Sequence, residues 1–263
     1  MNPFEHHSLS KIVERYKRDG FYIIKKCVNG TDLKIMSDYL TNKWQAYFQK
    51  EGYKKPHTKL ELHGDTLLIS PAFRKLALND HLLKLATLLQ GDDIQINYFG
   101  AQINPKQKPE KNGMPIHRDG GELYENLGYP FPDLGVKFAL WLTDGMELNR
   151  GNFIVIPGTQ YREVESNNDE TYSLKIEAGD VIMFDPRMLH GRGPNHSDII
   201  RQVIFMEYGP RWLEPKWNNS NLLTIKSNLR PIEFQLYSLF DDPWRSFAPR
   251  WIEKPLHRHL NKD

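Results

Sequence analysis

The sequence predicts a mainly β protein with flanking α-helices, and two features of the chain lead to this fold class. Over residues 94–208, apolar and polar residues alternate in short runs, which is the pattern of half-buried strands. Turn signals such as Asn112-Gly113 and Pro157-Gly158 separate these runs. Many short strands joined by turns are typical of a β sandwich or barrel.

The part of the chain before residue 93 is expected to be helical with one strand. Apolar residues recur there at helical spacing, and serine, glycine and proline residues mark the helix ends. The expected elements are a helix over residues 8–18 capped by Ser8 or Ser10, a strand over residues 21–24, a helix over residues 31–49 capped by Thr31, and a third helix that Pro71 opens, Asn79-Asp80 interrupts and Gly91 ends. Residues 51–65 are polar and show no regular pattern.

The strand-rich part follows, and the C-terminal part has no clear period. The expected strands are residues 94–99, 101–103, 136–142, 153–156, 172–176, 181–184 and 199–208. We expect one domain over residues 1–263, made of a helical part (about 1–92), a strand-rich core (about 93–210) and a C-terminal extension packed on it (about 211–263).

Composition narrows the classes of function. Lys and Arg number 35 and Asp and Glu 33, which leaves a net charge of +2 and gives no reason to expect nucleic acid or a membrane as partner. Cys27 is the single cysteine, so an intrachain disulfide and a thiolate metal cluster are excluded. One cysteine, and no apolar segment of the signal-peptide kind in residues 1–10, favour a cytoplasmic location. The oligomeric state cannot be read from these features.

The first chemical signal is the motif His117-Arg118-Asp119. If it lies on a strand, alternation places the His117 imidazole and the Asp119 carboxylate on the same face. One more histidine from another strand completes a two-histidine-one-carboxylate site, which leaves three metal positions open for ligands. The motif alone is a weak signal, and by itself it favours a surface turn in which Asp119 accepts a hydrogen bond from a loop amide.

The second signal lies further along the chain, where His190 directly follows a buried strand. Arg201 then begins an otherwise apolar strand, and burying an unpaired guanidinium there would be costly. Its planar fork of donors suits a carboxylate. The sequence is compatible with two partners for Arg201, the distal carboxylate of 2-oxoglutarate or an internal acid such as Asp185. His196 is a competitor of His190 as a ligand, but it lies in a polar loop.

Together these motifs occur in the order and spacing of a known family. The matching segments are residues 16–24, His117-Arg118-Asp119, residues 152–160, Gly179-Asp180, Leu189-His190, Pro194-Asn195 and Arg201. Over roughly residues 9–210 the chain resembles the phytanoyl-CoA dioxygenase family. The resemblance implies a double-stranded β-helix (jelly-roll) core and a dioxygenase that uses Fe(II), 2-oxoglutarate and O2.

The resemblance also implies roles for individual residues. His117, Asp119 and His190 would ligate Fe(II), and Arg201 would form a salt bridge with the tail of 2-oxoglutarate. Related halogenases replace the carboxylate ligand with a small residue, so Asp119 favours hydroxylation; desaturation, ring formation and epimerisation stay open.

Further candidates line the expected pocket. Gln102 and Asn104 are candidates to face the co-substrate. Trp141 is a candidate to face the cavity, although a tryptophan on a buried strand more often belongs to the plain core. Arg192 stands where family members often carry a small hydroxyl residue near the co-substrate, which raises the possibility that it meets an anionic substrate.

An aromatic insertion after Asp119 offers Tyr124, Tyr129 and Phe131 as candidate substrate-pocket residues. A self-packed surface loop is the alternative for these three. The substrate expected is a small polar metabolite or biosynthetic intermediate; an acyl-CoA thioester is the alternative within the family.

Two other classes of protein compete with this interpretation. A cupin-type enzyme or binding module with Mn or Zn would normally need a third histidine or a glutamate in the first cluster, and it leaves Arg201 without a role. A catalytically inactive protein of the same fold would be expected to have lost a ligand, and all three are present.

Overall fold

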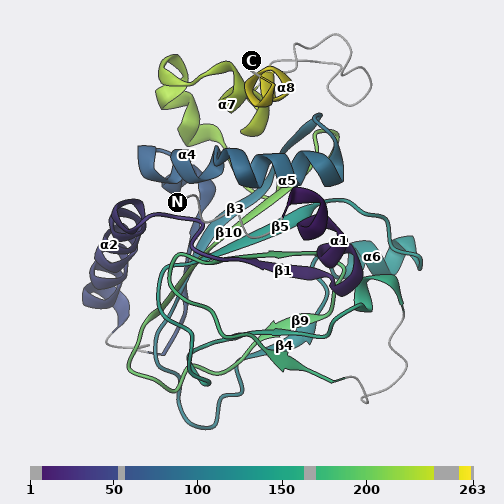
Figure 1. The fold of residues 1–263 in the computed structure, drawn as a ribbon. Helices are drawn as coiled ribbons and strands as arrows, with labels where there is room; N and C mark the ends of the chain where they lie inside the picture. Colours follow the sequence, from purple (N-terminus) through teal and green to yellow (C-terminus); the bar gives the residue numbers. More distant parts are fainter. Residues whose placement is uncertain (1–7, 53–56, 163–169, 240–254, 262–263) are drawn as a thin grey trace. The chain divides into compact units, whose positions relative to one another are not determined.

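The computed structural model describes residues 8–52, 57–162, 170–239 and 255–261 (Figure 1). The chain divides into two compact units, the first formed by residues 1–61, 101–133 and 138–204 and the second by residues 62–100, 134–137 and 205–263. The single domain expected from the sequence stays a prediction.

Strands dominate the described residues, as predicted. They are β1 (Phe21–Ile24), β2 (Leu60–His63), β3 (Ile94–Asn104), β4 (Met114–His117), β5 (Val136–Trp141), β6 (Phe153–Val155), β7 (Tyr172–Ser173), β8 (Val181–Phe184), β9 (His190–Arg192) and β10 (Arg201–Pro210). One sheet has the order β1-β8-β5-β10-β3-β2 and the other the order β4-β9-β6-β7. The pairs β1–β8, β4–β9, β6–β9 and β6–β7 are antiparallel.

Within the first unit the two sheets pack against each other through aromatic side chains. The Phe153 ring of β6 lies 4.9 Å from the Phe184 ring of β8, measured between centroids. Both are buried, and so is every residue of β8. Figure 1 shows β4 and β9 running below β1 in this unit. The face of β9 that is turned toward β8 is therefore an interior face. His190 is the first residue of β9.

Two helices precede these strands in the first unit, α1 (Leu9–Asp19) and α2 (Gly30–Tyr47). Helix α2 buries Met36, Leu40 and Trp44, which are four residues apart and so share one face. The prediction that Thr31 caps this helix is wrong. The Asn29 side chain accepts a hydrogen bond from the Asp32 backbone N–H at 2.9 Å, and Asn29 keeps the extended backbone of an N-cap, so Thr31 lies inside the helix.

The second unit contains the predicted third helix, interrupted where expected. Helix α4 (Pro71–Ala77) is followed by α5 (Asp80–Gln90), and Gly91 ends α5. Between them the Asn79 side chain accepts hydrogen bonds from the backbone N–H groups of His81 and Leu82 at 3.1 and 3.2 Å. An asparagine that bonds the local backbone in this way ends one helix and caps the next.

Several element boundaries differ from those predicted. Strand β2 lies in the polar stretch, β7 is shorter than expected and β10 begins at Arg201 instead of residue 199. The other α-helices are α3 (Gly64–Leu67), α6 (Glu122–Leu127), α7 (Pro231–Leu236) and α8 (Pro255–Leu260). Thr159–Tyr161 and Ser220–Asn228 form 3-10 helices, and Phe48–Gly52 forms a π-helical turn. Among the described residues, no helix has the length and apolar character needed to cross a bilayer.

Candidate metal centre

His117 and His190 meet because β4 and β9 are neighbours in the sheet. The antiparallel register places His117 directly opposite His190, and their ring centroids lie 4.6 Å apart. His117 is the last residue of β4 and His190 the first of β9. Strand pairing therefore brings together two imidazoles that are far apart in the sequence.

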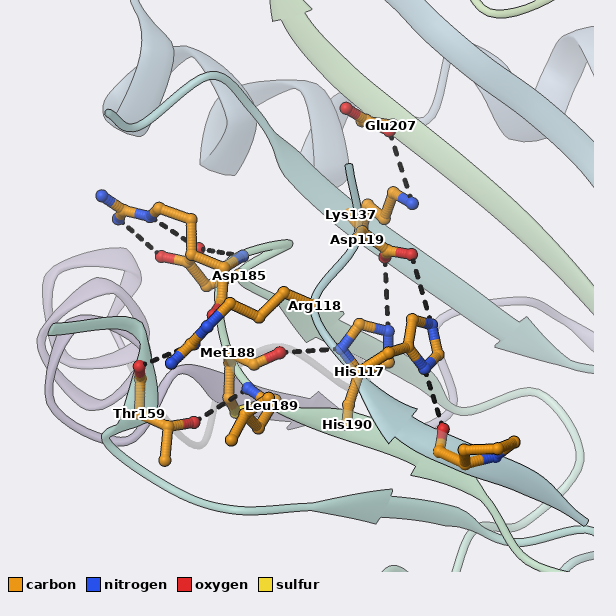
Figure 2. Close-up of polar contacts among 12 residues, drawn as sticks. His117, Arg118, Asp119, Lys137, Thr159, Asp185, Met188, Leu189, His190 and Glu207 are labelled. Atoms are coloured by element: carbon orange, nitrogen blue, oxygen red, sulfur yellow. Dashed lines mark hydrogen bonds and ion pairs between the residues drawn. The ribbon is translucent and has the colours of Figure 1, made fainter. Parts of the chain in front are cut away.

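Asp119 completes the cluster from a turn, and its predicted place on the strand is wrong. Strand β4 ends at His117 because a turn follows, in which Gly120 adopts a left-handed φ of 87°. The Asp119 backbone N–H donates to the Pro186 carbonyl at 2.9 Å, which holds this turn. Its carboxylate oxygens lie 3.6 Å from His117 Nε2 and 3.3 Å from His190 Nε2 (Figure 2).

Both imidazoles are oriented by backbone carbonyls. His117 Nδ1 contacts the Pro115 carbonyl at 2.9 Å, and His190 Nδ1 contacts the Met188 carbonyl at 2.8 Å. A carbonyl can only accept, so Nδ1 carries the proton in each ring and the Nε2 lone pair points toward Asp119. One atom from each of the three residues lies within 4.8 Å of the others. The two Nε2 lone pairs and the carboxylate converge, and a carbonyl holds each Nδ1–H. This donor set fits a divalent metal ion.

The surroundings make the centre dry on one side and accessible on the other. His190 is stacked on Phe153 with centroids 5.3 Å apart, and the Phe184 ring meets its edge at 5.0 Å. The side chains of His117 and Asp119 are 35% and 20% exposed, against 4% for His190. A ligand can therefore approach from the side of His117 and Asp119.

Arg118, between the two ligands of the motif, points away from the cluster and ties the turn to other loops. Its guanidinium donates to the backbone carbonyls of Thr159, Arg162 and Arg187, and it lies over the Phe131 ring at 5.1 Å. Figure 2 shows this side chain reaching toward Thr159. This role could not be predicted from the sequence, because the acceptors are backbone carbonyls that any residue could supply.

Arg201 lies on β10 as a buried cation. It is 1% exposed, its guanidinium stacks on Trp141 at 4.5 Å, and its Nη1 donates to the Asn104 side-chain oxygen at 2.6 Å. Two buried donors of this stacked pair, Arg201 Nε and Trp141 Nε1, have no hydrogen-bond partner within the described residues. Burial and, next, the charge of Arg192 lower the pKa of Arg201.

The internal acid that the sequence left as a partner for Arg201 is engaged elsewhere. Asp185 accepts hydrogen bonds from Arg187 Nε at 2.9 Å and from Arg187 Nη2 at 2.7 Å. Within the described part of the chain, no carboxylate pairs with Arg201. A buried guanidinium with unused donors on an aromatic ring is a receptor for an anion, so these residues fit the distal carboxylate of a bound dicarboxylate.

Comparison with known proteins gives the family. A sequence model described as phytanoyl-CoA dioxygenase (PhyH) matches residues 16–203. The chain belongs to the phytanoyl-CoA dioxygenase family. It is 28% identical over 175 residues to Dioxygenase af480 of Aspergillus fumigatus, covering 64% of this chain and 55% of that one. The chain spans about half the length of the curated relatives it matches. It covers 55% of the length of this dioxygenase and 55% of the length of a second curated relative.

Solved structures of low sequence identity share the fold of this phytanoyl-CoA dioxygenase family member. HygX from Streptomyces hygroscopicus, crystallised with nickel, 2-oxoglutarate and hygromycin B, superposes with a TM-score of 0.59 at 15% identity, over 78% of this chain and 88% of that one. The epimerase SnoN from nogalamycin biosynthesis superposes with a TM-score of 0.55 at 17% identity, over 77% and 81%. These likenesses confirm the predicted jelly-roll fold.

The remaining candidates for the co-substrate site of this family member occupy different places. Gln102 is half-buried on β3, and its side chain donates to the Glu61 side chain at 3.2 Å. Asn104, two residues further along β3, is buried and bonds Arg201. The structure therefore brings Asn104 and Trp141 to Arg201 and places Gln102 with Glu61; a co-substrate role for Gln102 stays a prediction.

The aromatic insertion forms one cluster. The Phe131 ring lies 5.5 Å from the Tyr124 ring and 5.7 Å from the Tyr129 ring. Tyr124 is buried against the turn that carries Asp119, since a Cβ added at Gly120 would lie 3.1 Å from its ring. The cluster thus begins beside the turn that carries Asp119 and ends at Tyr129, which is 44% exposed.

Proposed function

We propose that this protein is an Fe(II)- and 2-oxoglutarate-dependent dioxygenase in which His117, Asp119 and His190 hold the iron and Arg201 holds the distal carboxylate of the co-substrate. The observation that carries the proposal is the buried Arg201–Trp141 pair, whose unused donors have no carboxylate partner among the described residues. A cupin-type Mn or Zn site gives this pair no role, whereas a 2-oxo diacid bound to the metal requires a cation for its far end.

Each residue group has a separate task in this proposal. The two imidazoles and the carboxylate fix three metal positions on one side, which leaves the others for ligands. Phe153 and Phe184 exclude water from the His190 side. Iron with bound 2-oxoglutarate would supply the activation of O2 for oxidation of a C–H bond. Trp141 and Asn104 orient the Arg201 fork toward the co-substrate.

The experiment that tests the proposal does not need the substrate. Fe(II) and 2-oxoglutarate are added to the purified protein without oxygen, and the weak visible charge-transfer band of the chelated complex is recorded. We expect a band that saturates with 2-oxoglutarate and is absent with succinate, which lacks the 2-oxo group. No band, together with Zn or Mn retained on the protein, would support the cupin-type alternative.

For the substrate, we propose a small polar metabolite or biosynthetic intermediate that is hydroxylated. The aromatic cluster of Tyr124, Tyr129 and Phe131 is the proposed contact surface, because it begins at the turn that carries Asp119. The test compares small metabolites with acyl-CoA esters for O2-dependent release of succinate. Release with acyl-CoA esters alone would overturn this choice. The cytoplasmic location stays a prediction.

Gly151 provides a further test, because it makes room for Arg201. Its φ is 72°, and a Cβ added there would lie 2.5 Å from Arg201 Cδ. We expect Gly151→Ala to displace the guanidinium and to raise the Kd for 2-oxoglutarate about tenfold, which corresponds to about 1.4 kcal/mol. The anaerobic titration measures this Kd, and thermal unfolding reports the backbone strain.

Gly30 is the matched control for this substitution. It is the first residue of α2, and a Cβ added there meets nothing within 4 Å. Gly30→Ala is expected to leave the Kd unchanged and to keep or slightly raise the melting temperature. An unchanged Kd in Gly151→Ala would show that Arg201 is not positioned by this close approach.

A further inference from the structure

Arg192 lies on the same face of β9 as His190. The two residues are two positions apart on the strand, so their side chains point the same way, about 6.6 Å apart along the strand. His190 occupies the interior face, between Phe153 and Phe184. The Arg192 side chain is therefore directed into the interior of the first unit, on the side that carries the metal ligands.

Arg201 reaches the same end of this interior from β10. Arg192 is paired with Phe153 of β6, and Gly151 precedes Phe153 by two residues. The position that a Gly151 side chain would take is filled by the Arg201 side chain. Gly151 in turn donates its N–H to the Pro194 carbonyl, two residues beyond Arg192. Burial lowers the pKa of Arg201, and the charge of Arg192 lowers it further, as expected for two cations that repel each other.

Neither guanidinium is neutralised within the described part of the chain. Arg192 Nη1 donates to the Gln107 side-chain oxygen at 3.2 Å and, at 3.4 Å, to the Gly193 carbonyl, both of which are uncharged. The hydrogen-bonded partner of Arg201 is the uncharged Asn104 side chain. Arg201 is buried and Arg192 is half-buried, and two such cations that repel each other are unfavourable unless an anion binds between them.

We propose that Arg192 is a second arginine for the distal carboxylate of 2-oxoglutarate, so that one carboxylate is shared by Arg192 and Arg201. This inference rests on the proposed function. The His190 and Arg192 side chains leave the strand about 6.6 Å apart, a spacing that a five-carbon diacid bound to the metal at its other end can span. One carboxylate has two oxygens, and sharing it removes the repulsion between the guanidinium groups. Arg192 thus sets the preference for a 2-oxo diacid over a 2-oxo monoacid.

The test measures co-substrate preference without turnover. The Fe(II) protein is titrated without oxygen with 2-oxoglutarate and with 2-oxopentanoate, which has the same chain length but ends in a methyl group. We expect Arg192→Gln to weaken 2-oxoglutarate binding about tenfold or more. Binding of 2-oxopentanoate should stay equal or improve, because one uncompensated cation is removed. Melting of the metal-free protein with and without 2-oxoglutarate gives a second readout.

Two further variants complete the test. Lys108→Gln removes an exposed positive charge from the loop that contains Gln107 and is expected to leave both affinities unchanged. Arg192→Lys keeps the charge without the fork, and its 2-oxoglutarate affinity is expected between those of wild type and Arg192→Gln. This ordering also tests the proposal if Arg192→Gln does not fold.

The outcomes separate the inference from the proposed function. If both Arg192 variants bind 2-oxoglutarate within twofold of wild type, the inference is overturned. A higher KM for an anionic substrate in those variants would then assign Arg192 to the substrate site. If the wild type forms no complex with either 2-oxo acid, the proposed function itself fails.

Discussion

Replacing His190 by alanine is expected to remove the metal from the protein and to abolish turnover. His190 supplies one of the three clustered donor atoms, and it is held by the Met188 carbonyl and the Phe153 ring. Loss of a residue that only orients a ligand costs about 10- to 100-fold in metal affinity, so loss of the ligand itself should cost more than about 100-fold. Iron retained after gel filtration, and the shift in melting temperature on adding Fe(II), measure the effect.

His196→Ala is the matched control for this variant. His196 lies six residues further along, in a polar loop, where its Nε2 contacts the Lys111 carbonyl at 3.2 Å. We expect His196→Ala to retain iron and to show the wild-type shift in melting temperature. Loss of iron in His196→Ala with retention in His190→Ala would reverse the assignment of the second histidine ligand.

Replacing Arg201 by methionine is expected to abolish tight 2-oxoglutarate binding without destabilising the co-substrate-free protein. In that state the guanidinium is buried with no carboxylate partner among the described residues, so removing its charge relieves a desolvation cost. Hydrogen bonds to a charged group contribute about 1.5–3 kcal/mol, and the Kd for 2-oxoglutarate should therefore rise about 10- to 150-fold. Anaerobic titration gives the Kd, and thermal unfolding gives the stability.

Arg187→Met is the contrasting control, because Arg187 is a buried arginine that does have a carboxylate partner. Its Nη2 lies 2.7 Å from Asp185 Oδ2, and Asp185 is 2% exposed. Removing Arg187 leaves a buried carboxylate unpaired, which should lower the free energy of unfolding by about 3–5 kcal/mol. If Arg201→Met lowered the melting temperature as much as Arg187→Met, Arg201 would be a structural residue instead of an anion receptor.

The chemistry of the site could be predicted from the sequence because its signals are local. A histidine and an aspartate with one residue between them, a histidine just after a buried strand and an arginine in an apolar strand all stand out without a structure. The structure brings His117, Asp119 and His190 into one cluster, as predicted. Their binding of iron stays a proposal that the His190 experiment tests.

Other predictions were wrong, or elements were missed, for two reasons. Either the deciding contacts join segments that are distant in the sequence, or the local sequence fits two structures equally well. Thr31 and Asn29 are both good helix caps, and the extended backbone of Asn29 selects it. Asp119 lies in a turn because a carbonyl from the loop before His190 holds its backbone, and no local pattern reveals this. Strand β2 lies in a polar stretch because its side chains alternate between half-buried and exposed.

The residue pattern was enough to predict the mainly β fold, the residue types available for metal binding and a cation in a buried strand. Whether an internal carboxylate pairs with Arg201 became clear only from the arrangement of the strands and loops in space. Asp185 was an equally good candidate until the structure placed it on Arg187. Which pairs form depends on strand register and on the direction of each side chain. These are set by packing between segments far apart in the chain, and spacing along the sequence does not record them.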